Sequence, residues 1–156
     1  MGPILGDGVA GFFVHPDSVT QAWSYEGGSS RIGMSPLVSV TDPYVLETPN
    51  PSVAVLTDSL TASSGEATTI SFRGRPGARS FGQPTWGVST SRQGFVLSDG
   101  AILHLTVSTM ADRTRTLYGL KVVPDEVVDG PKTGDPATDP VLARAVDWLH
   151  TQAECS

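Results

Sequence analysis

The sequence has little of what nucleic-acid-binding, disulfide-stabilised or membrane-spanning proteins need. Lysine and arginine total 10 against 16 aspartates and glutamates, which gives a formal net charge of −6. No face can therefore be strongly basic, so we expect no nucleic-acid partner and favour a peptide or a small molecule. The single cysteine, Cys155, cannot form an internal disulfide.

The sequence also lacks targeting and metal-binding patterns. No apolar run approaches the roughly 20 residues that span a bilayer. Residues 1–13 have no cationic start, and Asp7 lies in their middle, which is not typical of a secretion signal. We therefore expect a soluble chain without a signal peptide or transmembrane segment, in a compartment that stays open. His, Cys and carboxylate residues do not cluster at metal-ligand spacing, so we expect no metal and no other cofactor.

Glycine and proline, in contrast, are abundant. The chain has 17 glycines and 12 prolines among 156 residues, and 38% of its residues are hydrophobic. A chain of this length and composition can fold as one domain, and the many turn residues favour short strands over long helices.

One segment in the middle has a clear order of elements. Residues 53–57 (VAVLT) form a β-rich apolar run, which predicts a strand buried on both faces, as in parallel sheets. Residues 58–62 then predict a short polar turn. Residues 63–72 predict a helix that opens with Ser-Ser-Gly-Glu and ends before Gly74.

Hairpins and a terminal helix are predicted around this segment. The Asp99-Gly100 pair predicts a two-residue turn between strands 94–98 and 101–108, and Gly27-Gly28 predicts another hairpin. The proline-bearing stretch 35–52 indicates a surface connection, and a short strand is expected around Val122 and Val123. After a polar linker at 129–138, Asp139 caps a helix whose apolar stripe predicts docking on the core.

Ser63 is the first candidate for chemistry. A serine at the start of a helix that follows a buried strand presents its hydroxyl where unpaired backbone N–H groups converge, and those groups can hold an oxyanion. Ser63 and Glu66 also form the S-x-x-E pattern of a capping box, which taken alone is usually structural. Local chemistry therefore leaves both interpretations open.

The wider pattern resembles the carboxy-terminal-processing (tail-specific) serine protease family from about Gly2 to Val128. Four motifs occur in the family's order and at matching spacing: the Ser-x-Gly-Glu form in 61–66 (TASSGE), the G-x-x-T-x-G turn in 82–87 (GQPTWG), the Leu-x-Asp-Gly hairpin in 97–100 with the Leu-Thr strand in 103–106, and the G-x-x-x-x-P-D segment in 119–125.

This resemblance implies an α/β fold, a crotonase/Clp-peptidase-like spiral of short β-strands and helices with a docked C-terminal helix. Residues 1–128 would be the C-terminal part of the catalytic domain, 129–138 a linker, and 139–156 a helix and tail packed on the same domain. It also implies a serine peptidase that hydrolyses peptides through an acyl-enzyme. Ser63 would be the nucleophile, the N–H of Ser64 an oxyanion donor, and Gly65 would let the substrate approach.

Two departures bear on the general base. The main branch of the family has its base lysine 25 residues beyond the nucleophile and a glutamine four residues later, where this sequence has Val88 and Arg92. A Ser/Lys dyad is therefore excluded. The sequence is more similar to the tricorn-like branch, in which a histidine from an earlier part of the domain is the base. That histidine, a Ser-His element and an Arg-x-Asn-x-Gly-Gly strand end would lie upstream of Met1.

Other interpretations remain. We expect His104, on a hairpin strand, to be solvated or satisfied, and we see no reason for His15 or His150 to lie near Ser63. Asp125 is interpreted as a structural landmark. Without its base, the same scaffold could be an inactive module that binds a peptide or a small ligand. The chain could instead be part of a split enzyme that pairs with an upstream companion chain, or it could form a homo-oligomer.

Overall fold

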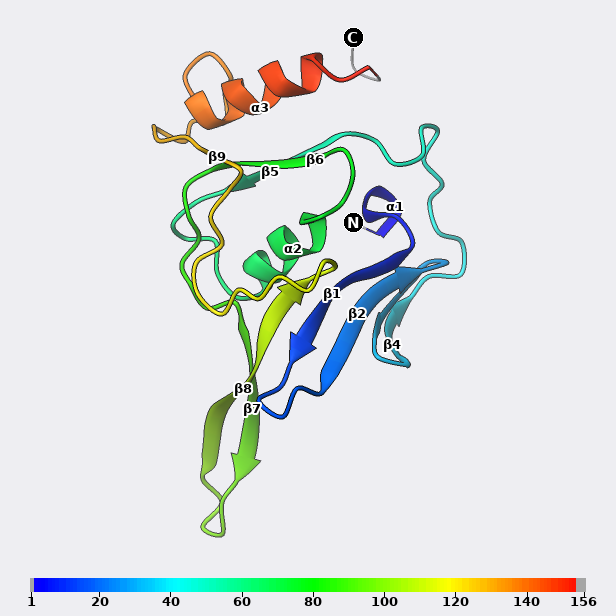
Figure 1. The fold of residues 1–156 in the computed structure, drawn as a ribbon, viewed down its shortest axis with the longest axis vertical. Coiled ribbons are helices and arrows are strands. Elements are labelled where there is room, and N and C mark those ends of the chain that lie inside the picture. Colours follow the sequence, from blue (N-terminus) through cyan, green and yellow to red (C-terminus); the bar gives the residue numbers. More distant parts are fainter. Residues whose placement is uncertain (1, 154–156) are drawn as a thin grey trace.

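The computed structural model of the protein describes residues 2–153. It contains a six-stranded antiparallel sheet in the order β4-β3-β2-β1-β8-β7 and a three-stranded parallel sheet in the order β5-β6-β9 (Figure 1). The first sheet comprises β1 (Gly8–Val14), β2 (Thr20–Glu26), β3 (Ser29–Ile32), β4 (Ser35–Ser39), β7 (Thr90–Val96) and β8 (Ile102–Asp112). The second comprises β5 (Val53–Thr57), β6 (Ala78–Gly82) and β9 (Glu126–Val127).

Three helices accompany the sheets: α1 (Gly2–Leu5), α2 (Ser64–Phe72) and α3 (Pro140–His150). Helix α2 contacts strands of both sheets, and α3 packs on the parallel one (Figure 1). The predicted strand 53–57 and the predicted helices that follow Ser63 and Asp139 are thus confirmed. The architecture is a mixed α/β fold with a curled antiparallel sheet and a C-terminal helix.

The antiparallel sheet includes strands that the sequence did not predict. Residues 8–14, within an opening that has the composition of a buried turn, form β1 in the middle of the sheet, between β2 and β8. Residues 35–39, predicted as part of a surface connection, form the edge strand β4, whose residues are all exposed. Prolines are tolerated at a sheet edge because no partner needs their missing N–H. The predicted Gly27-Gly28 hairpin is confirmed as β2–β3.

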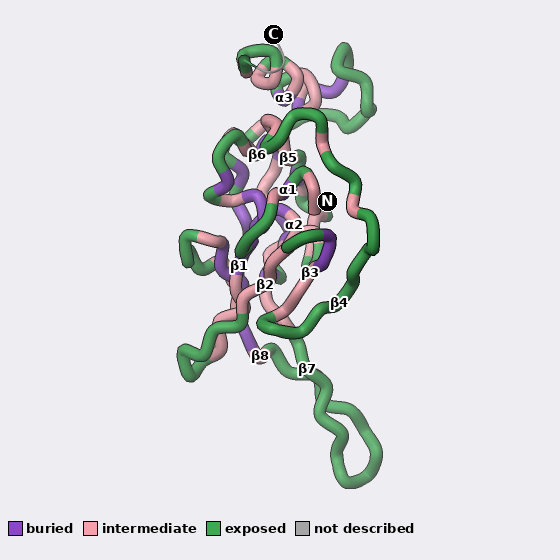
Figure 2. The backbone as a smooth tube through the Cα atoms, turned by 90° about the vertical axis from the view of Figure 1, so that its right-hand side faces the viewer, coloured by how far each residue is buried: buried purple, intermediate pink, exposed green. Residues whose placement is uncertain are grey.

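The hairpin of β7 and β8 projects from the body of the molecule (Figure 1), and Figure 2 shows its outer part exposed. Its turn differs from the prediction. The N–H of Leu97 donates to the carbonyl of Ala101 (2.8 Å), so the turn closed by this hydrogen bond encloses three residues rather than two, and Gly100 adopts a φ of 86°. A left-handed residue at the end of a three-residue connection is a common hairpin solution.

The core lies around α2 and between the parallel sheet and α3. Ile70 of α2, Met110 of β8 and Val122 form one buried cluster, and Phe81 of β6 packs with Val141 and Ala145 of α3 in another. Strand β5 is less buried than predicted: its parallel pairing with β6 is confirmed, but the side chain of Leu56 is exposed. The expected strand around Val122 is wrong, because the third parallel strand forms at 126–127 while Val122 lies in the core.

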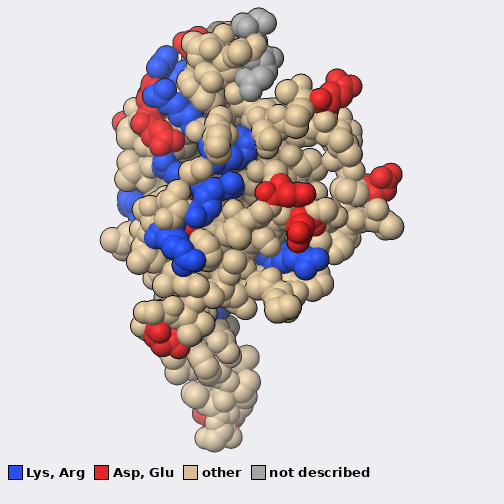
Figure 3. All heavy atoms as spheres, turned by 45° about the vertical axis from the view of Figure 1, so that its right-hand side comes forward, with Lys and Arg blue, Asp and Glu red and all other residues tan. Residues whose placement is uncertain are grey.

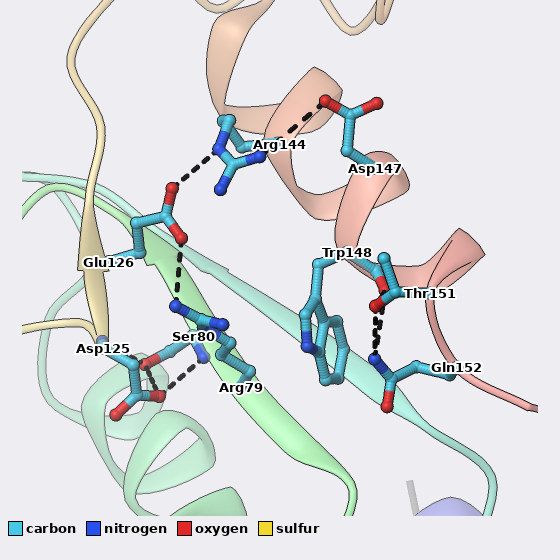
Figure 4. Close-up of polar contacts among 9 residues, drawn as sticks. All are labelled: Arg79, Ser80, Asp125, Glu126, Arg144, Asp147, Trp148, Thr151 and Gln152. Carbon is cyan, nitrogen blue, oxygen red and sulfur yellow. Dashed lines mark hydrogen bonds and ion pairs between the residues drawn. The ribbon is translucent and has the colours of Figure 1, made fainter.

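Asp139 starts α3 by accepting hydrogen bonds from the backbone N–H groups of Val141 and Leu142 (3.1 Å each). The helix is then held on the sheet by apolar contacts and by Arg144, which donates to Glu126 (2.7 Å), while Arg79 of β6 binds the same carboxylate (Figure 4). No helix within residues 2–153 is long and apolar enough to cross a membrane.

Candidate active site

The turn between β5 and α2 is held by a carboxylate. Asp58 accepts hydrogen bonds from the backbone N–H groups of Leu60 and Thr61 (2.8 Å each) and forms an ion pair with Lys132. The hydrogen bond from Lys132 is the main cause of a pKa of Asp58 below its ordinary value. These contacts fix the short path from the last residue of the strand to the first turn of the helix.

Ser63 occupies the N-cap of α2 in an uncommon backbone conformation. Its φ is 52° and its ψ is −109°, and its side chain is exposed. Such values cost of order 1–3 kcal/mol for a residue with a Cβ and persist only where the surroundings enforce them. A strained serine on a sharp strand-to-helix turn, with its oxygen exposed, is the arrangement found at the nucleophiles of several hydrolases.

Glu66 is the group that enforces this conformation. Its carboxylate is completely buried, and one oxygen, Oε2, accepts the backbone N–H of Ser63 at 2.9 Å. The other oxygen, Oε1, accepts the hydroxyl of Thr85 (2.5 Å) and the N–H of Gly87 (2.8 Å). The capping box predicted for Ser63 and Glu66 is therefore present, and the Glu66 side chain also binds a segment about 20 residues away.

Thr85 extends this network into the core. Its hydroxyl accepts the backbone N–H of Val122 (2.8 Å), and its own N–H donates to the carbonyl of Val122 (3.1 Å). Residues from three of the motifs quoted above, Glu66, Thr85 and Val122, are thus joined by hydrogen bonds. We infer that much of the motif pattern serves to hold the turn at Ser63.

Position 88 lies beside Ser63. The N–H of Val88 donates to Oε2 of Glu66 at 3.0 Å, so the N–H groups of residues 63 and 88 converge on one oxygen. The side chain of Val88 is 40% exposed. The backbone of position 88, where the main branch of the family has its lysine, is therefore held close to that of Ser63.

A groove of about 510 Å³ opens in front of Ser63. Its walls come from the start of α2, from β7 and from the facing strands β1 and β8: Phe13, Ser63, Ser64, Ala67, Thr90, Ser91, Arg92, His104 and Met110. Phe13 and Met110 are paired neighbours on β1 and β8 and supply apolar surface. Sequence reasoning did not single out either of them, because only the pairing of two strands distant in sequence brings them to the groove.

Ser64 and Gly65 directly follow Ser63, in the first turn of α2. Ser64 is the first residue of α2, and the N–H groups of a first helical turn have no partner within the helix. Gly65 leaves room on the turn, since a Cβ added there would lie 3.2 Å from Cγ2 of Thr61. The hydroxyl of Ser63 and the backbone N–H of Ser64, which has no partner within the helix, therefore lie on the same face of the groove.

Of the three histidines, only His104 lines the groove, together with Arg92. Neither His15 nor His150 is among the groove residues. The register of the hairpin places Arg92 opposite Thr106 and Gly94 opposite His104, so Arg92 and His104 lie on the same face. Within residues 2–153 we find no group of three His, Cys, Asp or Glu side chains that could hold a metal ion.

Asp125 lies away from the groove and ties β6 to the segment before β9. It accepts hydrogen bonds from the N–H and hydroxyl of Ser80 (2.8 and 2.7 Å) and pairs with Arg73 (Figure 4 shows the Ser80 contacts). Burial alone would raise the pKa of Asp125, but the hydrogen bonds from Ser80 and the charge of Arg73 outweigh it, so the pKa is lowered. These contacts hold two segments of the fold together, so we interpret Asp125 as a structural residue.

With this geometry in view, the family is clear. Residues 17–128 match Peptidase family S41, more than half of the chain, and the chain belongs to this family. The resemblance to carboxy-terminal-processing proteases is thus confirmed.

Individual relatives agree with this assignment. The nisin-resistance protein of Lactococcus lactis subsp. lactis is 27% identical over 152 residues, which are 97% of this chain and 44% of that protein. A lipoprotein from Streptococcus agalactiae has a similar structure, with a TM-score of 0.65 and 23% identity over 96% of this chain and 47% of its own. The photosystem II D1 C-terminal processing protease matches with a TM-score of 0.62 and 19% identity over 82% of this chain and 29% of its own. The chain thus spans less than half the length of these relatives.

Proposed function

We propose that the protein is the C-terminal part of a serine peptidase in which Ser63 forms an acyl-enzyme with a peptide substrate. The observation that carries the proposal is the exposed hydroxyl of Ser63, held at φ 52° and ψ −109° at the start of α2 and opening into a groove. In this function residues 1–128 belong to the catalytic domain, residues 129–138 connect it to the last helix, and that helix packs on the same domain. The expected tail at 154–156 lies outside the described residues.

The reaction is an ordinary acyl transfer. Oγ of Ser63 adds to the carbonyl carbon while its proton passes to a general base. The base then protonates the departing amine as the C–N bond breaks, and a water molecule hydrolyses the ester. The N–H of Ser64 stabilises the oxyanion of each tetrahedral intermediate, and the positive end of α2 adds to this. Gly65 keeps the approach to the carbonyl open.

The base is assigned to residues outside this sequence. Val88 has no proton-accepting group, and His104 lines the groove but, among the described residues, has no hydrogen bond to Ser63. The matched relatives are more than twice as long as the chain. We propose that an upstream segment or a companion chain supplies the base, as in the tricorn-like branch. A second copy of this chain is the alternative source.

A fluorophosphonate probe tests the nucleophile. We expect one covalent adduct, mapped by mass spectrometry to Ser63, in the chain produced with whatever polypeptide its coding sequence contains upstream of Met1. Ser63→Ala should abolish the adduct. Ser64→Ala is the matched control and should keep it, because only the backbone N–H of Ser64 takes part. A probe-free Ser63, or equal labelling of Ser63→Ala, would exclude this function.

The second candidate function is a catalytically inactive module that binds a peptide or small ligand on the same scaffold. It is favoured by Val88, which stands beside Ser63 where the main branch has its base. Calorimetry with peptides on the wild type and on Ser63→Ala separates the two. Equal affinity of both proteins without turnover by the wild type identifies a binding module, whereas turnover that is lost in Ser63→Ala identifies the peptidase.

A further inference from the structure

The groove in front of Ser63 has an unusual charge for this protein. Acidic residues outnumber basic ones in the chain by 16 to 10, yet the groove is lined by Arg92 and by no aspartate or glutamate. On the face that Figure 3 shows, acidic and basic side chains are spread over the body of the molecule. A locally cationic groove in an acidic protein indicates an anionic group on whatever occupies it.

Arg92 is free to bind such a group. Most cations of the chain are committed to partners: Arg73, Arg79, Arg144 and Lys132 form ion pairs, and Arg75 and Arg113 donate to backbone carbonyls. Within residues 2–153 the structure gives the guanidinium of Arg92 no hydrogen bond or ion pair, and its side chain is exposed. All N–H donors of its planar guanidinium are therefore available to a ligand, and their arrangement matches the two oxygens of a carboxylate.

The backbone around Arg92 is built to direct this side chain. The register between β7 and β8 shifts at the step from Ser91 to Arg92, where Val107 is the extra residue on β8. Such bulges change the direction of side chains and occur often beside functional sites. Gly94 then leaves room on the same face, since a Cβ there would lie 3.2 Å from Cε1 of His104. Strand β7 is also the edge of its sheet, so a peptide can lie beside it.

We propose that Arg92 is a specificity-determining residue that binds a carboxylate of the peptide lying in the Ser63 groove. The carboxylate is either the C-terminus of the peptide or an acidic side chain, since both present the same group. The apolar surface of Phe13 and Met110 contacts the neighbouring part of the peptide. This inference rests on the proposed function for the identity of the ligand as a peptide, but binding does not require Ser63 to react.

Calorimetry on the Ser63→Ala protein tests the proposal apart from the chemistry. Three short peptides of otherwise uncharged sequence are compared: a free acid, its C-terminal amide, and the amide with one internal glutamate. We expect the free acid, the glutamate peptide or both to bind about five- to tenfold more tightly than the plain amide at low ionic strength, and less so at high salt. Arg92→Gln should remove the difference. Which peptide gains affinity identifies the source of the carboxylate.

Lys121→Gln is the charge-matched control. Lys121 is exposed and does not line the groove, so this variant should keep the preference. Equal binding of all three peptides, no binding of any of them, or the same loss in Lys121→Gln as in Arg92→Gln would overturn the proposal. A carboxylate preference in a protein whose Ser63 takes no fluorophosphonate would leave Arg92 assigned and the peptidase excluded, so the two failures are distinguishable.

Discussion

At the scale of single residues, Glu66 explains most about the candidate site. Its two carboxylate oxygens accept four hydrogen bonds, from the N–H groups of Ser63, Gly87 and Val88 and from the hydroxyl of Thr85. Replacing a buried acceptor that has this many donors should strongly lower the stability of the protein, because each donor that loses its partner stays buried without a hydrogen bond. One side chain thus positions Ser63, the proposed nucleophile, and the segment that faces it.

Glu66→Gln should lower the free energy of unfolding by about 2–3 kcal/mol. The reason is geometric: each oxygen of Glu66 faces two donors, so either orientation of the amide puts its NH₂ group against N–H or O–H groups. Urea denaturation measures the change. Glu47→Gln is the matched control on an exposed glutamate and should change stability by less than about 0.5 kcal/mol. Equal effects of the two variants would contradict the role given to Glu66.

Val88→Lys should create a base beside Ser63. Because the N–H groups of residues 63 and 88 share one carboxylate oxygen, an amine at position 88 can reach the hydroxyl of Ser63. We expect fluorophosphonate labelling of Ser63 to become at least about tenfold faster and to rise with pH as the amine loses its proton. Val88→Met, of similar length without an amine, controls for shape. An unchanged rate in Val88→Lys would show that the two positions are not in reach of each other.

The sequence could identify Ser63 but not its environment. A serine, a small residue, a glycine and a glutamate after an apolar run are local features, and the capping pattern predicted one contact of Glu66. The contacts to Thr85 and Val88 join residues about 20 positions apart, and no local pattern specifies them. The placement of His104 and Arg92 in the groove depends on strand register, which the extra residue Val107 on β8 shifts.

At the scale of elements, the junction of β5, β6 and α2 positions the site. The carbonyl of Thr57, the last residue of β5, accepts the N–H of Gln83 (3.0 Å), and the hydroxyl of Thr57 donates to the carbonyl of Gln83 (2.8 Å). Gly82 makes this close approach possible. Its φ is 117°, and a Cβ there would lie only 2.1 Å from the carbonyl oxygen of Thr57.

Gly82→Ala should therefore destabilise the protein by about 3 kcal/mol or more, or prevent it from folding. Gly100→Ala is the matched control, since Gly100 also has a positive φ of 86° but no atom lies within 4 Å of an added Cβ. It should cost only about 1 kcal/mol of backbone strain. Thermal or urea denaturation of both variants checks the prediction. A cost for Gly82→Ala no larger than that of the control would contradict a tight junction.

Elements with strong local patterns were predictable, and those defined by pairing were not. Strand β5 and helices α2 and α3 follow from an apolar run and two helix starts. Strand β1 has the composition of a turn, yet it forms because β2 and β8 pair with both of its edges. The short strand β9 depends on two residues of β6, Phe81 and Gly82, so its position could not be read from the residues themselves.

At the scale of the whole molecule, acidic groups contribute a pH-dependent part of the stability. Five carboxyl groups among residues 2–153 have a pKa below the ordinary value: Asp58, Asp112, Asp125, Glu126 and Asp139. Asp112 is representative. Burial would raise its pKa, but hydrogen bonds from Thr114, Thr116 and Tyr118 outweigh this effect. Burial and Asp112 together raise the pKa of Tyr118 well above its ordinary value.

The free energy of unfolding should therefore fall in acid. A carboxyl group whose pKa is lower in the folded state contributes fully above its unfolded pKa, which is about 4, and loses that contribution as the pH falls through the folded value. We expect urea denaturation to give nearly constant stability between about pH 7 and 5, and a steady loss below about pH 4. The difference in the free energy of unfolding between the wild type and Asp112→Asn should become smaller over the same pH range. Parallel curves would contradict the assignment of Asp112.

The molecule spans less than half the length of its relatives, and its candidate site reflects this. The proposed nucleophile, the proposed oxyanion donor and the groove are on one chain, while Val88 stands where the main branch of the family has its base lysine. The apolar side chains on the projecting β7–β8 hairpin, among them Val96 and Ile102, are exposed. Composition alone argued against a nucleic-acid partner, but only the geometry of the groove separated the residues that line it from those that hold the fold.

The central claim is that the hydroxyl of Ser63 and the N–H of Ser64 face the same groove in a geometry fit for acyl transfer. A crystal structure of the protein after fluorophosphonate treatment measures this directly. We expect phosphorus bonded to Oγ of Ser63, a phosphonyl oxygen about 2.7–3.1 Å from the backbone nitrogen of Ser64, and the alkyl chain lying against Phe13 and Met110. A Ser63 left unmodified, or an adduct that points out of the groove with its oxygen away from Ser64, would contradict it.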